Sequence, residues 1–219
     1  VAVTADGRVV TGGADGARIW DLDSGRPPQV LEGHTGGVRA VAVTADGRIV
    51  TGSSDSKVRI WDLDSGRPPQ VVKGHALGVR AVAVTADGRV VTGGDDGTVR
   101  IWDLDSGRPP QVLEGHTGWV LAVAVAADGR IVFGGGDGRV RIWDPDRSRP
   151  PRVLEVQSVP LRRGILKRLT GGAGARAVAV TADGRIISGD DRTVGTGKPG
   201  SGQLARVLEG HTGGCGRWR

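Results

Sequence analysis

The sequence predicts an all-β protein, built from about five four-stranded antiparallel sheets. The first observation is a Trp-Asp pair that recurs every 41 residues, at Trp20-Asp21, Trp61-Asp62, Trp102-Asp103 and Trp143-Asp144. The second is the segment VAVTADGR, which occurs at 1–8, 41–48, 82–89 and 178–185, with VAVAADGR at 123–130. The third is a composition with 39 Gly and many Val and Ile, which favours short strands joined by tight turns. A fixed period of this size is typical of a repeat array.

One repeat, residues 38–74, predicts four strands in succession. Their expected ranges are 38–44, which is apolar enough to be buried on both faces, and then 48–52, 57–62 and 70–74. Turn residues separate them: Asp46-Gly47, the run 53–56, and Asp64 to Gly66. Pro68 and Pro69 precede the last strand and favour the edge of the sheet, because proline lacks an amide proton. The unit is therefore an antiparallel meander.

A single sheet of this kind exposes both faces and is not stable alone. Successive units bury each other when they pack face to face around an axis, so the expected architecture is a β-propeller. Each copy runs from strand one to strand four, and no strand is left over to close the ring. We therefore expect an open arc, or a ring that further sequence completes.

The Gly-His pair at the start of the unit and the Trp-Asp pair after its third strand resemble the WD40 repeat family. An Asp stands six residues before Trp-Asp in three repeats. The resemblance implies a buried hydrogen-bonded tetrad of His, a strand-two hydroxyl, the turn Asp and the Trp indole in each blade. The implied tetrads are His34, Thr51, Asp55 and Trp61 in blade two, with Ser53 as a rival hydroxyl, and His75, Thr92, Asp96 and Trp102 in blade three. Blade four has His116, Asp137 and Trp143, with Phe133 at the hydroxyl position.

The same alignment divides residues 1–219 into one propeller fragment. Its expected parts are blade one (1–33), blade two (34–74), blade three (75–115), blade four (116–155), a basic insertion (156–170), a degenerate blade five (171–210) and a tail (211–219). Blade one keeps Thr11, Asp15 and Trp20 without an upstream His. Blade five keeps Ser188 and Asp191, but Gly171 and Gly197 align with the His and Trp positions. The stretch 195–202 is expected to be a flexible linker in place of a lost third strand.

The resemblance also implies which residues face the top opening of the propeller channel. The position five residues after the motif His is expected there, as is the residue before the tetrad Asp. These positions hold Arg39, Arg80, Leu121, Arg176, Ser54, Asp95 and Gly136, and we expect Trp119 on the same face. A rim of guanidinium groups with one aromatic side chain suits a peptide that carries carboxylates or phosphates. Pairing of these Arg residues with neighbouring acids is the alternative.

Several kinds of chemistry are not favoured. His, Asp and Thr together resemble a hydrolase triad, but the set recurs in several blades with a Trp attached, and no oxyanion-hole sequence lies nearby. Residues 21–32 resemble a calcium loop only faintly, and Lys73 stands at a ligand position in the next copy. In 195–202, Pro199 follows Lys198 where a phosphate loop needs Ser or Thr. Four His and one Cys provide no zinc-ligand set, so no metal or cofactor is expected.

The net charge of +6 comes from the last third of the sequence, where residues 147–219 carry 14 basic side chains. Leu161, Ile165 and Leu169 are spaced by four within 156–170 and are interleaved with Arg and Lys, which favours either a short amphipathic helix or an irregular loop. Binding of nucleic acid or an anionic surface through 147–219 is therefore the alternative function. A salt titration of binding distinguishes this function from peptide recognition, because the affinity for a polyanion should fall more steeply as salt is added.

The favoured function is a non-catalytic scaffold that binds a protein or peptide partner on the top face. No run of about twenty apolar residues is present, so no transmembrane segment is expected. The single Cys215 cannot form an internal disulfide, and a cytoplasmic protein is expected. The sequence begins inside a repeat, which favours a piece of a larger polypeptide. An excess of Arg over Lys suggests GC-rich coding and a bacterial source.

Overall fold

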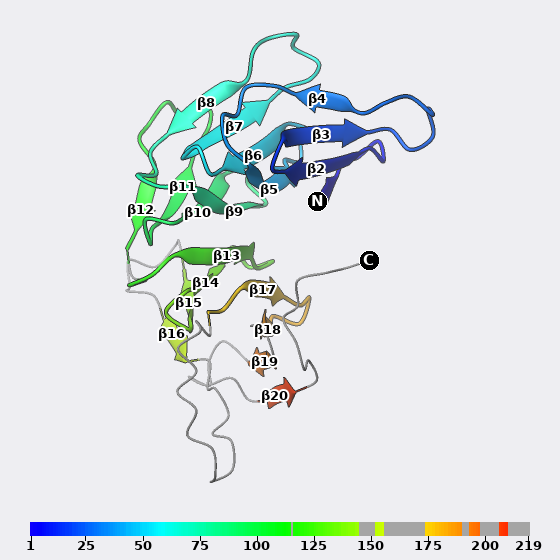
Figure 1. Cartoon of the computed structure of the whole chain (residues 1–219). Helices are drawn as coiled ribbons and strands as arrows, with labels where there is room; N and C mark the ends of the chain where they lie inside the picture. Colours follow the sequence, from blue (N-terminus) through cyan, green and yellow to red (C-terminus); the bar gives the residue numbers. More distant parts are fainter. Residues whose placement is uncertain (115, 145–151, 156–173, 190–192, 198–205, 210–219) are drawn as a thin grey trace. The chain divides into compact units, whose positions relative to one another are not determined.

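A computed structural model of the chain describes residues 1–114, 116–144, 152–155, 174–189, 193–197 and 206–209. In these residues, twenty strands form five four-stranded antiparallel sheets, each with its strands in sequence order (Figure 1). The expected meander is therefore confirmed in the first four repeats, and the fifth also forms four strands. The chain divides into two compact units, Val1–Glu114 and Gly115–Arg219, which are described separately below.

The first unit holds three sheets. Sheet one comprises β1 (Ala2–Val3), β2 (Val9–Gly13), β3 (Gly16–Trp20) and β4 (Gln29–Leu31). Sheet two comprises β5 (Val38–Val43), β6 (Ile49–Ser53), β7 (Lys57–Trp61) and β8 (Gln70–Lys73). Sheet three comprises β9 (Val79–Val84), β10 (Val90–Gly94), β11 (Val99–Trp102) and β12 (Gln111–Leu113). The strands expected within 38–74 agree with β5–β8 to within one residue at each end. Beyond Val38, however, most of β5 is half-buried rather than buried on both faces.

The second unit holds two sheets. Sheet four comprises β13 (Val120–Val125), β14 (Ile131–Gly135), β15 (Arg139–Trp143) and β16 (Arg152–Glu155). Sheet five comprises β17 (Ala177–Val180), β18 (Ile186–Gly189), β19 (Thr193–Gly197) and β20 (Arg206–Glu209).

The third strand of sheet five corrects the expectation that residues 195–202 replace it with a linker. β19 pairs with both β18 and β20, and Gly197 lies opposite Ile186. Strand pairing needs only backbone groups, so the loss of the Trp side chain at this position does not prevent it. The predicted helix or loop at 156–170, Asp191 and the tail 211–219 lie outside the described residues.

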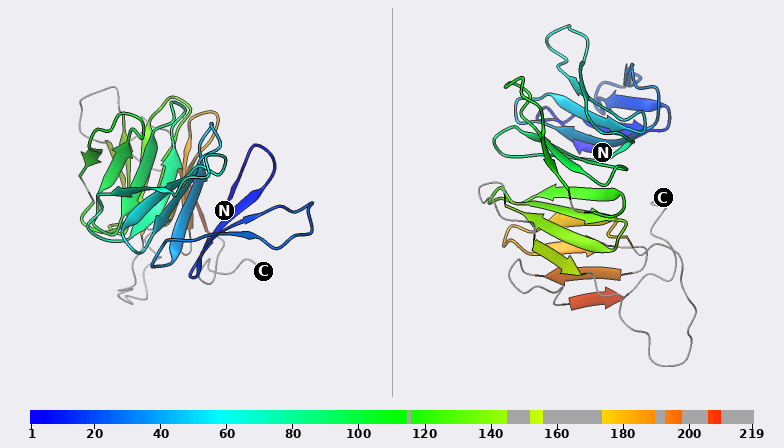
Figure 2. Two further views of the ribbon diagram at one scale, coloured as in Figure 1. Left: turned by 90° about the horizontal axis from the view of Figure 1, so that it is seen from above. Right: turned by 90° about the vertical axis from the view of Figure 1, so that its left-hand side faces the viewer.

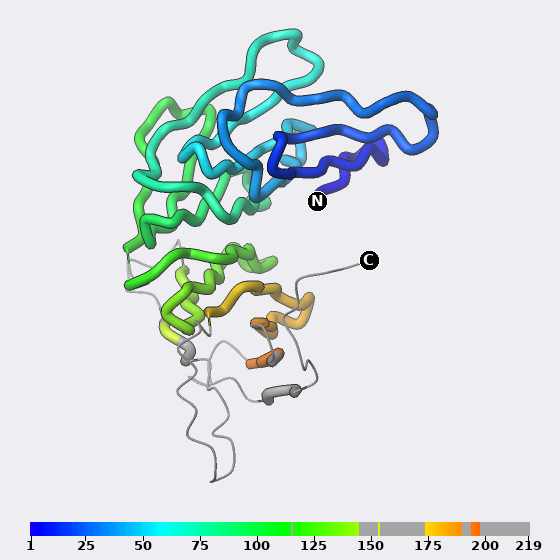
Figure 3. Tube along the Cα trace, in the orientation of Figure 1, coloured from blue at the N-terminus to red at the C-terminus, as the bar shows by residue number. Residues whose placement is uncertain are grey.

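The turn after each first strand has the same internal bonding in four copies. The Thr hydroxyl donates to the carboxylate of the Asp two residues later and also lies within hydrogen-bond distance of the Arg carbonyl that closes the turn, as in Thr44, Asp46 and Arg48. The Gly between Asp and Arg has a positive φ, 85° at Gly47. Thr, Asp and Gly therefore each contribute to this turn, although the turn of sheet four has the same backbone hydrogen bonds with Ala126 in place of Thr. Longer loops join the third and fourth strands and project from sheets one and two in the tube of Figure 3.

Neighbouring sheets within each unit pack face to face, and the apolar core lies between them (Figure 2). Ile49 and Trp61 of sheet two pack against the Val10, Ala17, Ile19 and Leu31 face of sheet one. The opposite face of sheet two packs in the same way against Val79, Val90 and Trp102 of sheet three. In the second unit, Val132, Val140 and Ile142 pack against Ala175 and Ile186. The first strands of neighbouring sheets lie next to one another. In the first unit, β5 contacts both β9 and the short β1 with its partner β2, and in the second unit β13 contacts β17. This is the packing that a β-propeller requires between adjacent blades.

In the first unit, the Trp of a Trp-Asp pair is buried where the preceding sheet covers it. Trp61 and Trp102 expose 7% and 6% of their surface, whereas Trp20 of sheet one exposes 37%. In the described residues, the structure has no helix with the length and apolar character needed to cross a membrane.

Candidate functional site

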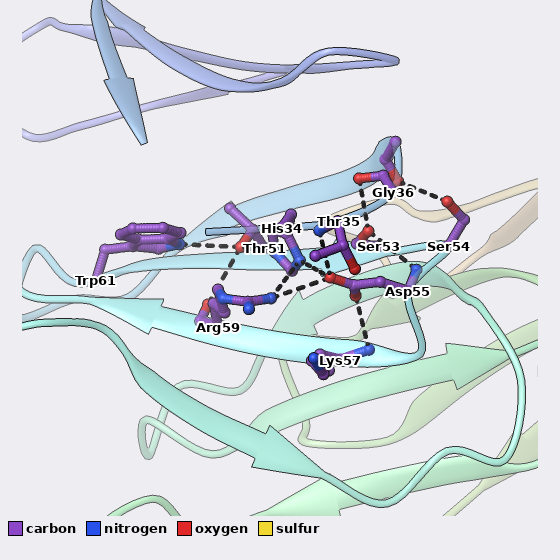
Figure 4. Close-up of polar contacts among 11 residues, drawn as sticks. His34, Thr35, Gly36, Thr51, Ser53, Ser54, Asp55, Lys57, Arg59 and Trp61 are labelled. Carbon is purple, nitrogen blue, oxygen red and sulfur yellow. Dashed lines mark hydrogen bonds and ion pairs between the residues drawn. The ribbon is translucent and has the colours of Figure 1, made fainter. Parts of the chain in front are cut away.

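The tetrad of sheet two is a continuous chain of polar contacts between two strands, the turn that joins them and the Gly-His segment (Figure 4). Trp61 Nε1 lies 2.9 Å from Thr51 Oγ1, and Thr51 Oγ1 lies 2.8 Å from His34 Nε2. His34 Nδ1 lies 2.9 Å from a carboxylate oxygen of Asp55. The rival hydroxyl, Ser53, donates instead to the Gly36 carbonyl at 2.9 Å.

One assignment of protons satisfies the four members of this chain, although Arg59 Nη1, which can only donate, also lies 2.7 Å from His34 Nδ1. The indole N–H of Trp61 can only donate, and the ionised carboxylate of Asp55 can only accept. Thr51 therefore accepts from Trp61 and donates to His34 Nε2, and the Nδ1–H of His34 donates to Asp55. A neutral imidazole with its proton on Nδ1 fits both ends. Each polar group thus compensates the burial cost of the next.

Sheet three repeats the arrangement. Trp102 Nε1 donates to Thr92 Oγ1 at 2.9 Å, and Thr92 lies 2.7 Å from His75 Nε2. His75 Nδ1 lies 3.0 Å from both carboxylate oxygens of Asp96. The Thr98 hydroxyl also donates to Asp96, at 2.8 Å. The two networks therefore share one geometry although their surrounding residues differ.

The electrostatics of these groups favour neutral imidazoles and ionised carboxylates. Burial lowers the pKa of His34, His75 and His116, and this effect exceeds the opposing influence of the partner Asp. Burial by itself would raise the pKa of Asp55, but hydrogen bonds from His34, Thr35 and Lys57 lower it to about 2. Hydrogen bonds likewise outweigh burial and lower the pKa of Asp96 and Asp137.

An arginine in the third strand joins each of these networks, and the sequence reasoning assigned it no role. Arg59 lies opposite Thr51 and donates to Asp55 at 3.1 Å. Arg141 donates to Asp137 at 2.9 Å in sheet four, and Arg100 lies 3.8 Å from Asp96 in sheet three. Arg59 and Arg141 are buried. The sequence did contain an indication of this contact: Arg59 stands two residues before Trp61, so the two side chains share one face of the strand.

Sheet four keeps only part of the tetrad. His116 Nδ1 lies 2.8 Å from Asp137, but Phe133 has no hydroxyl and lies opposite Arg141, where Thr51 lies opposite Arg59. The Phe133 ring meets the His116 imidazole edge-on, with centroids 5.4 Å apart. An aromatic contact thus replaces the hydroxyl relay between imidazole and indole.

The networks of the two terminal sheets are incomplete. In sheet one, Trp20 Nε1 donates to Thr11 at 2.8 Å, while Asp15 pairs with Arg18 at 2.6 Å and is largely exposed. In sheet five, Gly197 stands opposite Ile186, as Trp61 stands opposite Ile49. The buried Ser188 hydroxyl has no hydrogen-bond partner among the described residues. Loss of the Trp side chain leaves this hydroxyl without its usual donor.

Three of the expected top-face residues converge in the first unit. Asp95 lies between two guanidinium groups: it pairs with Arg39 at 3.0 Å and with Arg80. Arg39 follows the Gly-His segment of sheet two, whereas Arg80 and Asp95 belong to sheet three. The side chains remain partly open, with exposures of 39% for Arg39, 27% for Arg80 and 16% for Asp95. The alternative considered above, pairing of the Arg residues with an acid, therefore describes the observed geometry.

Of the other expected top-face residues, Ser54 lies in the first unit and is half-buried, and the rest lie in the second unit. Trp119 exposes 53% of its surface, Arg176 is exposed, and Leu121 is half-buried. Most of the basic segment 147–219 lies outside the described residues, so the alternative function that depends on it has no structural description here.

Comparison with known families agrees with the repeat pattern. The family described as WD domain, G-beta repeat matches residues 25–62, 66–103 and 107–144, which together make up more than half of the chain. Each match ends at a Trp-Asp pair. No curated protein matches the chain, and the bacterial source stays an expectation. The family matches, the five four-stranded sheets and the His–hydroxyl–Trp networks show that the chain belongs to the WD40 repeat family.

Proposed function

We propose that the chain is a non-catalytic interaction scaffold that binds an acidic peptide or protein segment at the cluster of Arg39, Arg80 and Asp95. The single observation that carries the proposal is the convergence of two partly exposed guanidinium groups on one carboxylate. Two Arg and one Asp leave one net positive charge in the cluster. Planar guanidinium groups can hold a carboxylate or phosphate through paired hydrogen bonds.

The burial of the histidines supports a structural role for the His–Asp–Thr sets rather than catalysis. The side chains of His34, His75 and His116 expose 0%, 1% and 0% of their surface. A catalytic imidazole must reach the proton that it transfers, within hydrogen-bond distance of a substrate. The occurrence of the His–Asp contact in three sheets also fits a role in holding each sheet together.

The cluster can exchange partners because its side chains are partly exposed. Ion pairs near the surface contribute only about 0–1 kcal/mol, so an incoming acidic group can compete with Asp95 for the two Arg side chains. Recognition would then depend on how two Arg side chains and one acid compete, and not on a deep pocket.

The experiment is binding to an array of peptides with graded Asp, Glu and phosphoserine content. The double variant Arg39→Glu with Arg80→Glu should lose the acidic peptides that the unmodified chain captures. The matched control is Arg26→Glu with Arg67→Glu, which makes the same change of charge at two exposed turn positions. Retention of the same peptides by the Arg39→Glu, Arg80→Glu chain would refute the proposal, and loss by both double variants would show a general charge effect instead.

A further inference from the structure

The outer face of sheet one presents an incomplete tetrad to solvent. Trp20 exposes 37% of its surface, against 7% for Trp61 and 6% for Trp102. The side chain of Asp15 is 66% exposed, whereas those of Asp55 and Asp96 are 4% and 9% exposed. The same residue types are thus open in sheet one and buried in sheets two and three.

The members that remain already have the geometry of the complete networks. Trp20 Nε1 lies 2.8 Å from Thr11 Oγ1, and the matching distance is 2.9 Å in sheets two and three. Arg18 lies opposite Thr11 and pairs with Asp15, as Arg59 lies opposite Thr51 and pairs with Asp55. The hydroxyl, carboxylate, guanidinium and indole are therefore in place, and the imidazole is the missing member.

Sheet one also has room for an imidazole. In sheets three and four, a Cβ at Gly94 or Gly135 would stand 2.4 Å or 2.2 Å from Nδ1 of the tetrad histidine. The matching residue of sheet two is Ser53, beside which His34 still contacts Thr51 and Asp55, so a small residue at this position leaves space for the ring. Gly13 follows Thr11 by two residues, as Gly94 follows Thr92, so sheet one keeps the same space.

The segment that supplies the imidazole in sheets two and four recurs after the last strand. The sequence VLEGH occurs at 30–34, 112–116 and 207–211. Leu31 of β4 lies opposite Ala17, Leu113 of β12 lies opposite Val99, and Leu208 of β20 lies opposite Val194. β20 therefore has the register of the strands that lead into a Gly-His segment. The described histidines His34, His75 and His116 each serve another sheet, which leaves His211.

We propose that the open face of sheet one is a docking site for residues 210–213, Gly-His-Thr-Gly, of a second copy of this chain. In sheet two, the identical tetrapeptide 33–36 places its imidazole on Thr51 and Asp55 and its next amide on Asp55 at 3.0 Å. On sheet one, the imidazole of His211 would bridge Thr11 and Asp15, and the Thr212 amide would donate to Asp15. The contact joins the last sheet of one copy to the first sheet of the next, so it is head-to-tail.

Sedimentation velocity over a range of concentrations tests the association. The unmodified chain should associate as its concentration rises, and the His211→Ala chain should stay monomeric over the same range. An unmodified chain that is monomeric throughout, or a His211→Ala chain that associates equally well, would overturn the proposal.

Binding of a fluorescent peptide tests the surface itself. The probe is residues 208–214, Leu-Glu-Gly-His-Thr-Gly-Gly, added to the His211→Ala chain. Fluorescence anisotropy should show saturable binding, which disappears when Ala replaces His in the peptide. Asp15→Ala in the chain should weaken binding about tenfold or more, because hydrogen bonds to a charged acceptor are lost.

The control for Asp15→Ala is Asp23→Ala, an exposed carboxylate in the turn after β3 of the same sheet. It should leave peptide binding unchanged. The indole N–H signal of Trp20 should also shift on binding, because its Thr11 partner gains the imidazole. Equal affinity of the His and Ala peptides, or equal loss in Asp15→Ala and Asp23→Ala, would place the peptide elsewhere and overturn the proposal.

Discussion

The burial of His75 shows how much one residue contributes to its sheet. His75 exposes 1% of its side chain and connects Thr92 with Asp96. Two bonded partners therefore depend on one ring, and each is itself buried or nearly so. A buried group that loses its partner costs about 1–3 kcal/mol.

His75→Ala is therefore expected to lower the free energy of unfolding by about 2–3 kcal/mol, since it leaves Thr92 and Asp96 with fewer partners. The control is Asp87→Ala in the neighbouring turn. Asp87 is 55% exposed and pairs with Arg89, so its loss should cost less than about 1 kcal/mol. Urea unfolding followed by tryptophan fluorescence measures both. Equal losses in the two variants would contradict a structural role for the tetrad.

The lowered pKa of three histidines predicts that stability falls in mild acid. In the unfolded chain their pKa is about 6.5, and burial places it lower in the folded chain. Above pH 6.5 the histidines are neutral in both states and the stability is complete. Below pH 6.5 the unfolded chain takes up protons first, so each histidine removes up to about 1.4 kcal/mol per pH unit until its folded pKa is reached.

The tetrad carboxylates extend this loss to lower pH. Asp55 has a folded pKa of about 2, so its contribution is present above its unfolded pKa and is lost as the pH falls towards 2. Urea unfolding at pH 7.5, 6 and 5 tests the histidine part of the prediction. An unfolding free energy that does not change between pH 7.5 and 5 would contradict it.

At the scale of strands and sheets, glycines in the second strands set the distance between neighbouring sheets. A Cβ on Gly12 would stand 2.7 Å from Val38 Cγ1, and one on Gly52 would stand 2.6 Å from Val79 Cγ1. A Cβ on Gly134 would stand 2.6 Å from the Ala175 carbonyl oxygen. These contacts are all with the next sheet, and real Cβ atoms do not approach so closely. A side chain there must push the sheets apart.

Gly134→Ala is therefore expected to destabilise sheets four and five by about 1–3 kcal/mol, because neither the Ala175 backbone nor the sheet can move aside freely. Gly136→Ala is the matched control, since its Cβ would meet nothing closer than 3.6 Å. That variant should change stability by less than about 1 kcal/mol, with a small gain allowed by the loss of chain entropy. Urea unfolding distinguishes the pair. Similar stability of the two variants would show that the sheets adapt.

The strand pattern of sheet two was predictable because Asp-Gly turns and alternating side chains are local signals. The tetrads, such as that of His34, Asp55 and Trp61, were implied by the resemblance to the WD40 repeat family. Burial of Arg59 did not follow, because burying a guanidinium depends on a carboxylate and an imidazole brought in from the segments around it. The third strand of sheet five was missed for a related reason: Gly195 and Gly197 weaken the pattern, but their backbones still pair with β18.

For the whole molecule, stability is expected to be the sum of sheets and the interfaces between neighbours, as in other repeat proteins. Trp61 is buried because sheet one covers it, while nothing in the first unit covers Trp20 in the same way. Near-identical repeats therefore have different environments that depend only on their neighbours. The two proposed binding sites accordingly lie at the positions where near-identical repeats differ in exposure or sequence, the Arg39, Arg80 and Asp95 cluster and the open face of sheet one.

The most direct test of this account is hydrogen exchange of the tryptophan indole protons, measured by NMR on the His211→Ala chain so that the face of sheet one stays free. The indole protons of Trp61 and Trp102 donate to Thr51 and Thr92 beneath a covering sheet, and we predict that they exchange slowly. Those of Trp20 and Trp119, on exposed surfaces, should exchange much faster. Exchange of Trp61 and Trp102 as fast as that of Trp119 would contradict the claim that the tetrads are buried supports of stacked sheets.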